Sequence, residues 1–263
     1  MTTATAFLHQ GSIVFYGLAL AVALLLPRRG TAGPLAAGWL AAVGFLLQFL
    51  LLVLRWRASG HLPVTGLFET QHFLALWVMA SALYALLRYR AVPFLPAALA
   101  LAVAALSFAS LGPKDIVPLS PAIDTPLFLI HVATSFAAYG LFGVAALTAI
   151  LRLTGRAVAP GTGDRRILDE CLYIGYILFT WCMIAGSLWA YLAWGSYWTW
   201  KIKGLWSWIL WFYYSGVLHV RRRRGWQGRP VSLLAVAGFA LVLFSYLGLG
   251  LLFQTSHPLL PRD

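Results

Sequence analysis

Eight long stretches of apolar residues, separated by short segments rich in charges, glycines and prolines, constrain this chain more than any other feature. A helix that spans a bilayer needs about 20 mostly apolar residues. The stretches run continuously instead of alternating between apolar and polar residues, which favours membrane helices over the strands of a β-barrel. We expect helices near residues 8–27, 36–54, 71–87, 92–111, 127–151, 167–193, 205–220 and 231–253.

The composition excludes a soluble fold of this size. Hydrophobic residues make up 61% of the chain and charged residues 10%, against about 45–50% and about 25% in soluble domains. The sequence therefore predicts an all-α, polytopic membrane protein with about eight transmembrane helices, in which residues 1–263 form a single integral membrane domain. We expect no removable signal peptide, because the N-terminus lacks a basic region and a small-residue cleavage site.

The net charge of +12 indicates orientation in a membrane rather than binding of nucleic acid. Segments that follow even-numbered stretches contain five basic residues, Arg262 lies in the tail, and segments that follow odd-numbered stretches contain thirteen. Basic loops stay in the cytoplasm, so both termini and a tryptophan-rich loop at 194–204 are expected outside the cytoplasmic (inner) membrane. The run Arg221–Arg224 is expected to bind anionic lipid. The thirteen basic residues in the segments that follow odd-numbered stretches are Arg28, Arg29, Arg88, Arg90, Arg152, Arg156, Arg165, Arg166, Arg221, Arg222, Arg223, Arg224 and Arg229.

Histidine is the residue type that points to a cofactor. In this topology His219 falls at the inner end of the seventh stretch, and the other five histidines fall at or near the outer face. A neutral imidazole nitrogen is a ligand for iron or zinc. Because Cys171 and Cys182 have no CxxC spacing and no carboxylates cluster nearby, haem iron fits better than structural zinc. The alternative is that each histidine is a polar anchor at the interface. The five histidines expected at or near the outer face are His9, His61, His72, His131 and His257.

Tryptophan is concentrated in one region, since eight of the twelve lie within residues 181–211. An interfacial aromatic belt accounts for part of this. The segment WGSYWTW, however, places four large rings in one short external loop that Gly195 bends. Broad aromatic faces beside external histidines form a platform for a flat, apolar porphyrin, and Lys201 and Lys203 are candidates to pair with its propionates.

Five segments together resemble a known family. WGSYWTWKIKGLWSW resembles the tryptophan-rich loop of the cytochrome c assembly family, the CcsA/ResC/CcmC group of haem-handling membrane proteins. Further segments resemble that family in the same order: GHLPVTGLFETQHFLALW, FLIHVATSFAAYG, YYSGVLHVRRRRGWQGRP and YLGLGLLFQTSH. The resemblance covers residues 55–257. It departs from the family at residues 200–204, where WKIKG stands in place of the usual W-D-P-K-E.

The resemblance implies a role in cytochrome c biogenesis. A b-type haem, bound non-covalently and transported to the external platform, would be presented to apocytochrome c, and the chain would be a component of a haem lyase or synthetase. His131 and His257 would be the axial ligands beside the loop. His219 would ligate a second haem, for which a CcsB/ResB-type membrane partner would supply the other ligand. The remaining candidate haem-binding residues are Trp194, Gly195, Trp198, Trp200, Lys201, Lys203 and Trp206.

Two other functions stay open at this point. The segment LHQGSIVFYGLAL resembles HemX-like members of the same family, which are linked to the regulation of haem biosynthesis. A transporter for another substrate is the third hypothesis. Glu69 is an isolated carboxylate that either orients His61 or His72 through a hydrogen bond or marks a solvated helix start.

Overall fold

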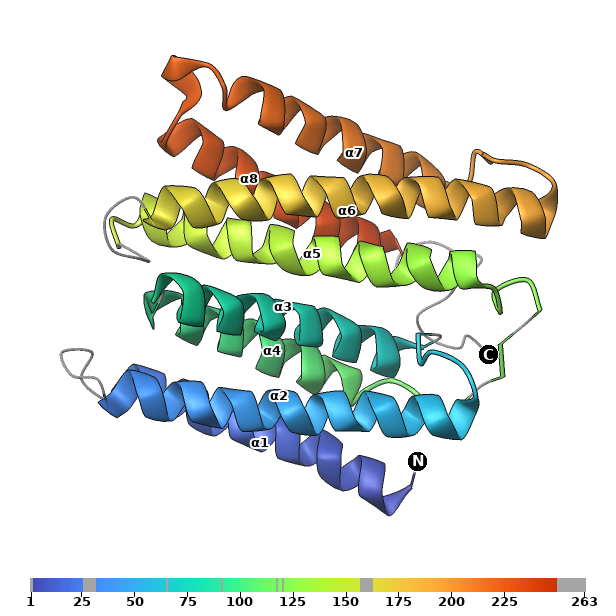
Figure 1. The fold of residues 1–263 in the computed structure, drawn as a ribbon, viewed down its shortest axis with the longest axis horizontal. Helices are drawn as coiled ribbons and strands as arrows, with labels where there is room; N and C mark the ends of the chain where they lie inside the picture. Colours follow the sequence, from blue (N-terminus) through green and yellow to red (C-terminus); the bar gives the residue numbers. More distant parts are fainter. Residues whose placement is uncertain are drawn as a thin grey trace. The chain divides into compact units, whose positions relative to one another are not determined.

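The computed structural model describes residues 2–25, 32–64, 66–90, 92–116, 118–119, 121–156 and 163–249, and these contain helices and no β-strand. Short 3-10 turns lie at Val92–Phe94 and Arg224–Trp226, and a π-helical turn, Phe244–Gly248, continues the last helix. The α-helices (Figure 1) are α1 (Thr3–Leu25), α2 (Ala32–Ser59), α3 (Leu67–Tyr89), α4 (Leu95–Ala109), α5 (Pro126–Leu153), α6 (Gly163–Trp194), α7 (Ile202–Val220) and α8 (Arg229–Leu243).

Each predicted apolar stretch forms one of these helices. Six segments are long and apolar enough to cross a membrane, namely α1, α2, α3, α5, α6 and the combined segment Arg229–Gly248. Of the other two, α4 is apolar but has 15 residues, and α7 has 19. The prediction of an all-α, polytopic membrane protein is confirmed.

Two helix starts show how short polar residues set the boundaries. The hydroxyl of Thr2 accepts a hydrogen bond from the backbone N–H of Thr5 at 3.3 Å, and Thr125 accepts one from Phe128 at 3.2 Å ahead of α5. Such caps satisfy N–H groups that the first turn leaves unpaired. With the Thr2 cap, α1 starts at Thr3, five residues before the predicted stretch.

The chain divides into two compact units. The first comprises residues 1–117 and 155–167 and contains α1 to α4. The second comprises residues 118–154 and 168–263 and contains α5, nearly all of α6, α7 and α8.

Hydrogen bonds from side chains to other side chains and to the backbone connect α1, α2, α3 and the residue that follows α4. Tyr16 of α1 donates to Gln48 of α2 at 2.6 Å, and the Gln48 amide donates to the carbonyl of His72 in α3 at 2.8 Å. The imidazole of His9 lies 3.0 Å from that of His72 and 2.8 Å from the hydroxyl of Ser110, which follows α4. His9 and His72 are 3% and 0% exposed, so both belong to the interior of this unit rather than to an interfacial surface.

Close glycine contacts bring the helices of the second unit together. A Cβ at Gly175 of α6 would lie 2.7 Å from the ring of Phe142 in α5, and one at Gly143 would lie 3.1 Å from Phe239 in α8. The Phe142 ring also stacks on Tyr214 of α7, with 3.6 Å between ring centroids. Small residues allow membrane helices to approach this closely.

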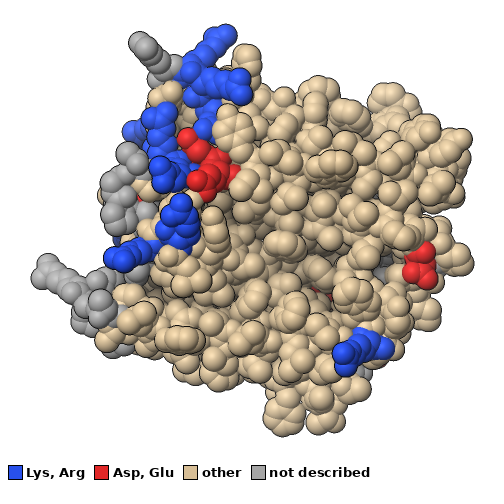
Figure 2. All heavy atoms as spheres, in the orientation of Figure 1, with Lys and Arg blue, Asp and Glu red and all other residues tan. Residues whose placement is uncertain are grey.

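Charge is unevenly distributed over the second unit. Figure 2 shows basic side chains gathered where α7 gives way to α8. One of them, Arg221, binds Asp169 of α6 at 2.7 Å and lies over the ring of Tyr173. Lys201 and Lys203 lie at the other end of α7, which is about 28 Å away for 19 helical residues.

Candidate functional site

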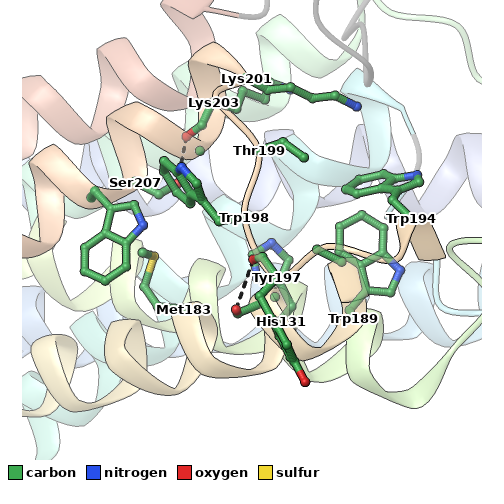
Figure 3. A pocket seen from close by; sticks show the side chains of 15 residues that line it. His131, Met183, Trp189, Trp194, Tyr197, Trp198, Thr199, Lys201, Lys203 and Ser207 are labelled. Atoms are coloured by element: carbon green, nitrogen blue, oxygen red, sulfur yellow. Dashed lines mark hydrogen bonds between the residues drawn. The ribbon is translucent and has the colours of Figure 1, made fainter. Parts of the chain in front are cut away.

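A hollow of about 240 Å³ lies within the second unit, between α5, α6, the loop that follows α6 and the start of α7. Four of the residues that line it are tryptophans, two are lysines and none is acidic (Figure 3). We call this hollow the Trp-loop pocket. Its lining consists of His131, Met183, Gly186, Ser187, Trp189, Ala190, Trp194, Tyr197, Trp198, Thr199, Lys201, Lys203, Gly204, Ser207 and Trp208.

The loop is shaped by its small and polar residues. Gly195 has a φ of +71°, a left-handed conformation that favours glycine at the end of a helix, and its N–H bonds to the carbonyl of Tyr191 at 2.8 Å. Ser187 of α6 then donates to the carbonyl of Tyr197 at 3.0 Å. These bonds turn the chain back along α6, so that Trp198 faces the pocket.

His131 is the one histidine in the pocket lining. Its Nδ1 lies 2.9 Å from the carbonyl oxygen of Cys182, so Nδ1 carries the hydrogen and donates. The other ring nitrogen, Nε2, has no hydrogen-bond partner among the described residues. A neutral imidazole with a protonated Nδ1 offers its lone pair on Nε2, which is the arrangement seen in metal-binding histidines.

A series of aromatic contacts extends from His131 to Lys201. The indole of Trp189 stacks beside the imidazole at 6.2 Å and 19°, and its N–H donates to the carbonyl of Ala122 at 2.6 Å. Trp194 meets Trp189 edge to face at 4.8 Å. The ammonium of Lys201 lies 4.5 Å from the centre of the Trp194 ring, a cation–π contact. Flat apolar surface thus leads from the imidazole to a cation.

Five predicted site residues meet in this pocket: His131, Trp194, Trp198, Lys201 and Lys203. The other described candidates lie elsewhere. Gly195 forms the turn that ends α6 and is not part of the lining, and the Trp200 side chain is 84% exposed. Trp206 packs edge to face on Phe244 at 4.8 Å.

Two predicted histidine ligands are not part of the pocket lining. His219 is exposed in the last turn of α7, at the end of that helix away from Lys201 and Lys203. His257 lies outside the residues that the structure describes.

A metal ion alone has no site in the described part of the chain. The described residues contain no group of three or more His, Cys, Asp or Glu side chains that could hold a metal ion. Haem iron differs in this respect, because the porphyrin supplies four nitrogen ligands and the protein needs to supply only the axial ones. The pocket offers one imidazole nitrogen beside aromatic faces and lysines.

The sequence of nearly the whole chain, residues 7–257, matches the cytochrome c assembly proteins. The chain belongs to this family. Its relatives include the cytochrome c biogenesis protein CcsA of Synechococcus sp. (strain CC9902), 33% identical over 81% of this chain and 83% of the relative. The CcsA protein of Chlamydomonas reinhardtii is 32% identical over 82% of this chain and 65% of the relative. The predicted family is therefore confirmed.

A solved structure with a similar fold is that of the cytochrome c haem lyase CcmF. It superposes with a TM-score of 0.70 at 20% identity, over 97% of this chain and 48% of the CcmF chain. This likeness concerns the fold, and the chain spans about half the length of that protein.

Three residues that support the site in this family member were not predicted from the sequence. In the sequence, Trp189 is typical of an interfacial aromatic belt, Cys182 of a buried helix residue and Gly186 of a helix-packing position, so none of them indicates a site. All three act through contacts between α5 and α6, and no local motif in the sequence marks those contacts.

Proposed function

We propose that this cytochrome c assembly protein binds b-type haem non-covalently at the Trp-loop pocket and presents it to apocytochrome c for covalent attachment. The observation that carries the proposal is the His131 imidazole, which lies in the lining of an aromatic, lysine-bearing pocket with its Nε2 lone pair unused. The family membership supports a role in cytochrome c maturation.

The size and chemistry of the pocket support a platform rather than a closed cavity. Its 240 Å³ is below the roughly 300–1,000 Å³ of pockets that enclose a ligand, so a porphyrin would lie partly outside and remain accessible to a second protein. The tryptophan faces would exclude water from one side of the ring. Lys203 and Lys201 would pair with carboxylates at the ring edge.

The roles of the residues follow from this arrangement. When bound, haem supplies the vinyl groups to which the thiols of a CxxCH segment add. The residues that would hold the haem are His131, through Nε2, and His257 as the second iron ligand, with Trp189, Trp194 and Trp198 supplying the apolar faces. Catalysis of this kind is positioning, which makes the protein a component of a haem lyase or synthetase.

The inner end of α7 supports a second part of the proposal. His219 would ligate another haem there, with the other ligand from a CcsB/ResB-type membrane partner, because the pocket residues on α7, Lys203 to Trp208, precede it by 16 to 11 residues, about 24 to 16 Å along the helix. The arginines beside His219 support a cytoplasmic location for this end and contact with anionic lipid. The Trp-loop pocket would then face the outside of the inner membrane.

The test is co-expression with a reporter apocytochrome c and a CcsB/ResB-type partner, together with absorption spectra of the purified protein. We expect a low-spin haem spectrum and covalent haem on the reporter, and both should be lost with His131→Ala. A purified protein with bound haem that never increases holocytochrome would favour the HemX-like regulatory function. A folded protein without haem would favour a transporter for another substrate. Either result overturns the proposal.

A further inference from the structure

The hydrogen bond that orients His131 uses a carbonyl group inside a helix. The acceptor is the backbone oxygen of Cys182, in the middle of α6. In an α-helix this oxygen already accepts the N–H of residue 186. A carbonyl oxygen has two lone pairs, so the imidazole of His131 can share the oxygen if it reaches it from the side.

Gly186 gives the imidazole that access. Helical side chains point toward the N-terminus and cover the turn that precedes them, so a side chain at position 186 would cover the carbonyl of Cys182. A Cβ at Gly186 would lie 2.5 Å from Nδ1 of His131 and 2.9 Å from its Cε1. Any residue other than glycine would therefore occupy the space that the imidazole needs to reach this oxygen.

Three further contacts fix the ring once it is there. Trp189, one turn after Gly186, stacks beside the imidazole at 6.2 Å. The thiol of Cys182 lies 3.3 Å from Nδ1. Phe128, one turn before His131 in α5, lies 6.4 Å from the imidazole between ring centroids. The ring is thus held by contacts with its own neighbours in the protein.

We infer that Gly186 is a positioning residue: by leaving the carbonyl of Cys182 uncovered, it fixes His131 as the Nδ1–H tautomer and presents the Nε2 lone pair to the Trp-loop pocket. The inference about the tautomer concerns the protein alone. Its consequence for haem rests on the proposed function.

A matched control exists on the same pair of helices. Gly175 makes the same kind of contact with α5, since a Cβ there would lie 2.7 Å from Phe142. Gly175→Ala therefore disturbs the packing of α5 on α6 to a similar degree and does not touch His131. Cys182→Ser is the second control, because it removes the thiol and keeps the carbonyl.

The first measurement is ¹⁵N NMR of histidine-labelled protein without haem, with the His131 signals assigned by their loss in His131→Gln. We expect the shifts of the Nδ1–H tautomer in the wild type, in Gly175→Ala and in Cys182→Ser. In Gly186→Ala, Nδ1 should lose its acceptor and the tautomer should become mixed. A wild-type His131 protonated on Nε2 overturns the inference, even if Gly186→Ala does not fold. A change in Cys182→Ser as large as in Gly186→Ala also overturns it, because the thiol would then be the acceptor.

The second measurement is haem affinity per folded protein. Loss of an outer hydrogen bond to a metal-binding histidine typically weakens metal affinity about 10–100-fold, and we expect a loss of this size in Gly186→Ala, with partial rescue by added imidazole. Gly175→Ala should bind like the wild type. Equal losses in both glycine variants overturn the positioning role. Absence of haem from every protein, together with the expected tautomer, would contradict the proposed function and leave the inference standing.

Discussion

The guanidinium of Arg55 at the end of α2 and the carboxylate of Glu69 at the start of α3 form an ion pair of 2.7 Å, with side chains 2% and 3% exposed. The same guanidinium donates to the carbonyl of Lys114 at 2.9 Å and lies over the ring of Phe68. Glu69 is therefore not a solvated helix start. These contacts link α2, α3 and the segment after α4 inside the first unit.

Removal of one member of this pair should destabilise the protein strongly. Breaking a buried ion pair leaves an unpaired buried charge and costs about 3–5 kcal/mol, so we expect that loss for Arg55→Leu and for Glu69→Leu. The double variant should lose clearly less than the sum, because it leaves no unpaired charge. Unfolding of the purified protein in mixed micelles measures this. Arg57→Leu, an exposed neighbour in the last turn of α2, is the control with an expected change below about 0.5 kcal/mol. Additive effects would contradict a coupled pair.

Reporter fusions test the orientation in the membrane. Because basic segments stay in the cytoplasm, a fusion after Arg224 should be cytoplasmic, and fusions after Lys203 or Asp263 should be external. The activity of a reporter that folds on only one side of the membrane measures this. The reverse pattern would place the Trp-loop pocket in the cytoplasm and remove the basis for presenting haem to external apocytochromes.

Substitution of the two proposed haem ligands should lower the haem content. If His131 and His257 hold the iron as proposed, His131→Ala and His257→Ala should each weaken haem binding at the outer site, and added imidazole should restore it in part. Absorption spectra per folded protein give the measurement. His9→Ala is the control: it leaves His72 without its hydrogen-bond partner, at a cost of about 1–3 kcal/mol in stability, but should retain the haem. Equal haem content in all three variants would contradict the ligand assignment.

The loop tryptophans should differ in importance according to their position. Trp198 lines the pocket, whereas Trp200 is 84% exposed and is not part of the lining. Loss of an aromatic face that covers the ligand removes about 1.5–3 kcal/mol, so Trp198→Ala should lower haem affinity at least about tenfold. Trp200→Ala should be nearly silent.

Lys201→Asp provides the electrostatic comparison in the same binding assay. An exposed ion pair contributes about 0–1 kcal/mol, so the affinity should change about fivefold at most. Full haem occupancy in well-folded Trp198→Ala protein would refute the platform, and a larger effect of Lys201→Asp than of Trp198→Ala would assign the binding mainly to charge.

The sequence predicts the helices well because length and apolar content alone determine them. The prediction failed where a polar side chain sets the boundary, as Thr2 does for α1. The sequence also did not reveal the buried contacts of His9 with His72 and Ser110. Such a pairing depends on which helices are neighbours, and apolar runs carry no information on that.

The site was partly predictable for a related reason. Trp194, Trp198, Lys201 and Lys203 are close in the sequence, so a loop that gathers them is visible as a motif. His131 was linked to the loop through the family resemblance. The direction of each side chain was not predictable: Trp206 turns toward Phe244, because its position on α7 and the packing of α8 decide which face it covers.

The two glycine contacts between α5 and α6 fix the register of one helix against the other. His131 and Phe142 are eleven residues apart, and so are their partners Gly186 and Gly175. Each residue advances a helix by about 100°, so one inserted or deleted residue between the contacts would rotate one glycine away from its ring. The number of residues between Gly175 and Gly186 is therefore fixed by the packing of α6 on α5, whatever side chains stand at the positions between them that face away from α5.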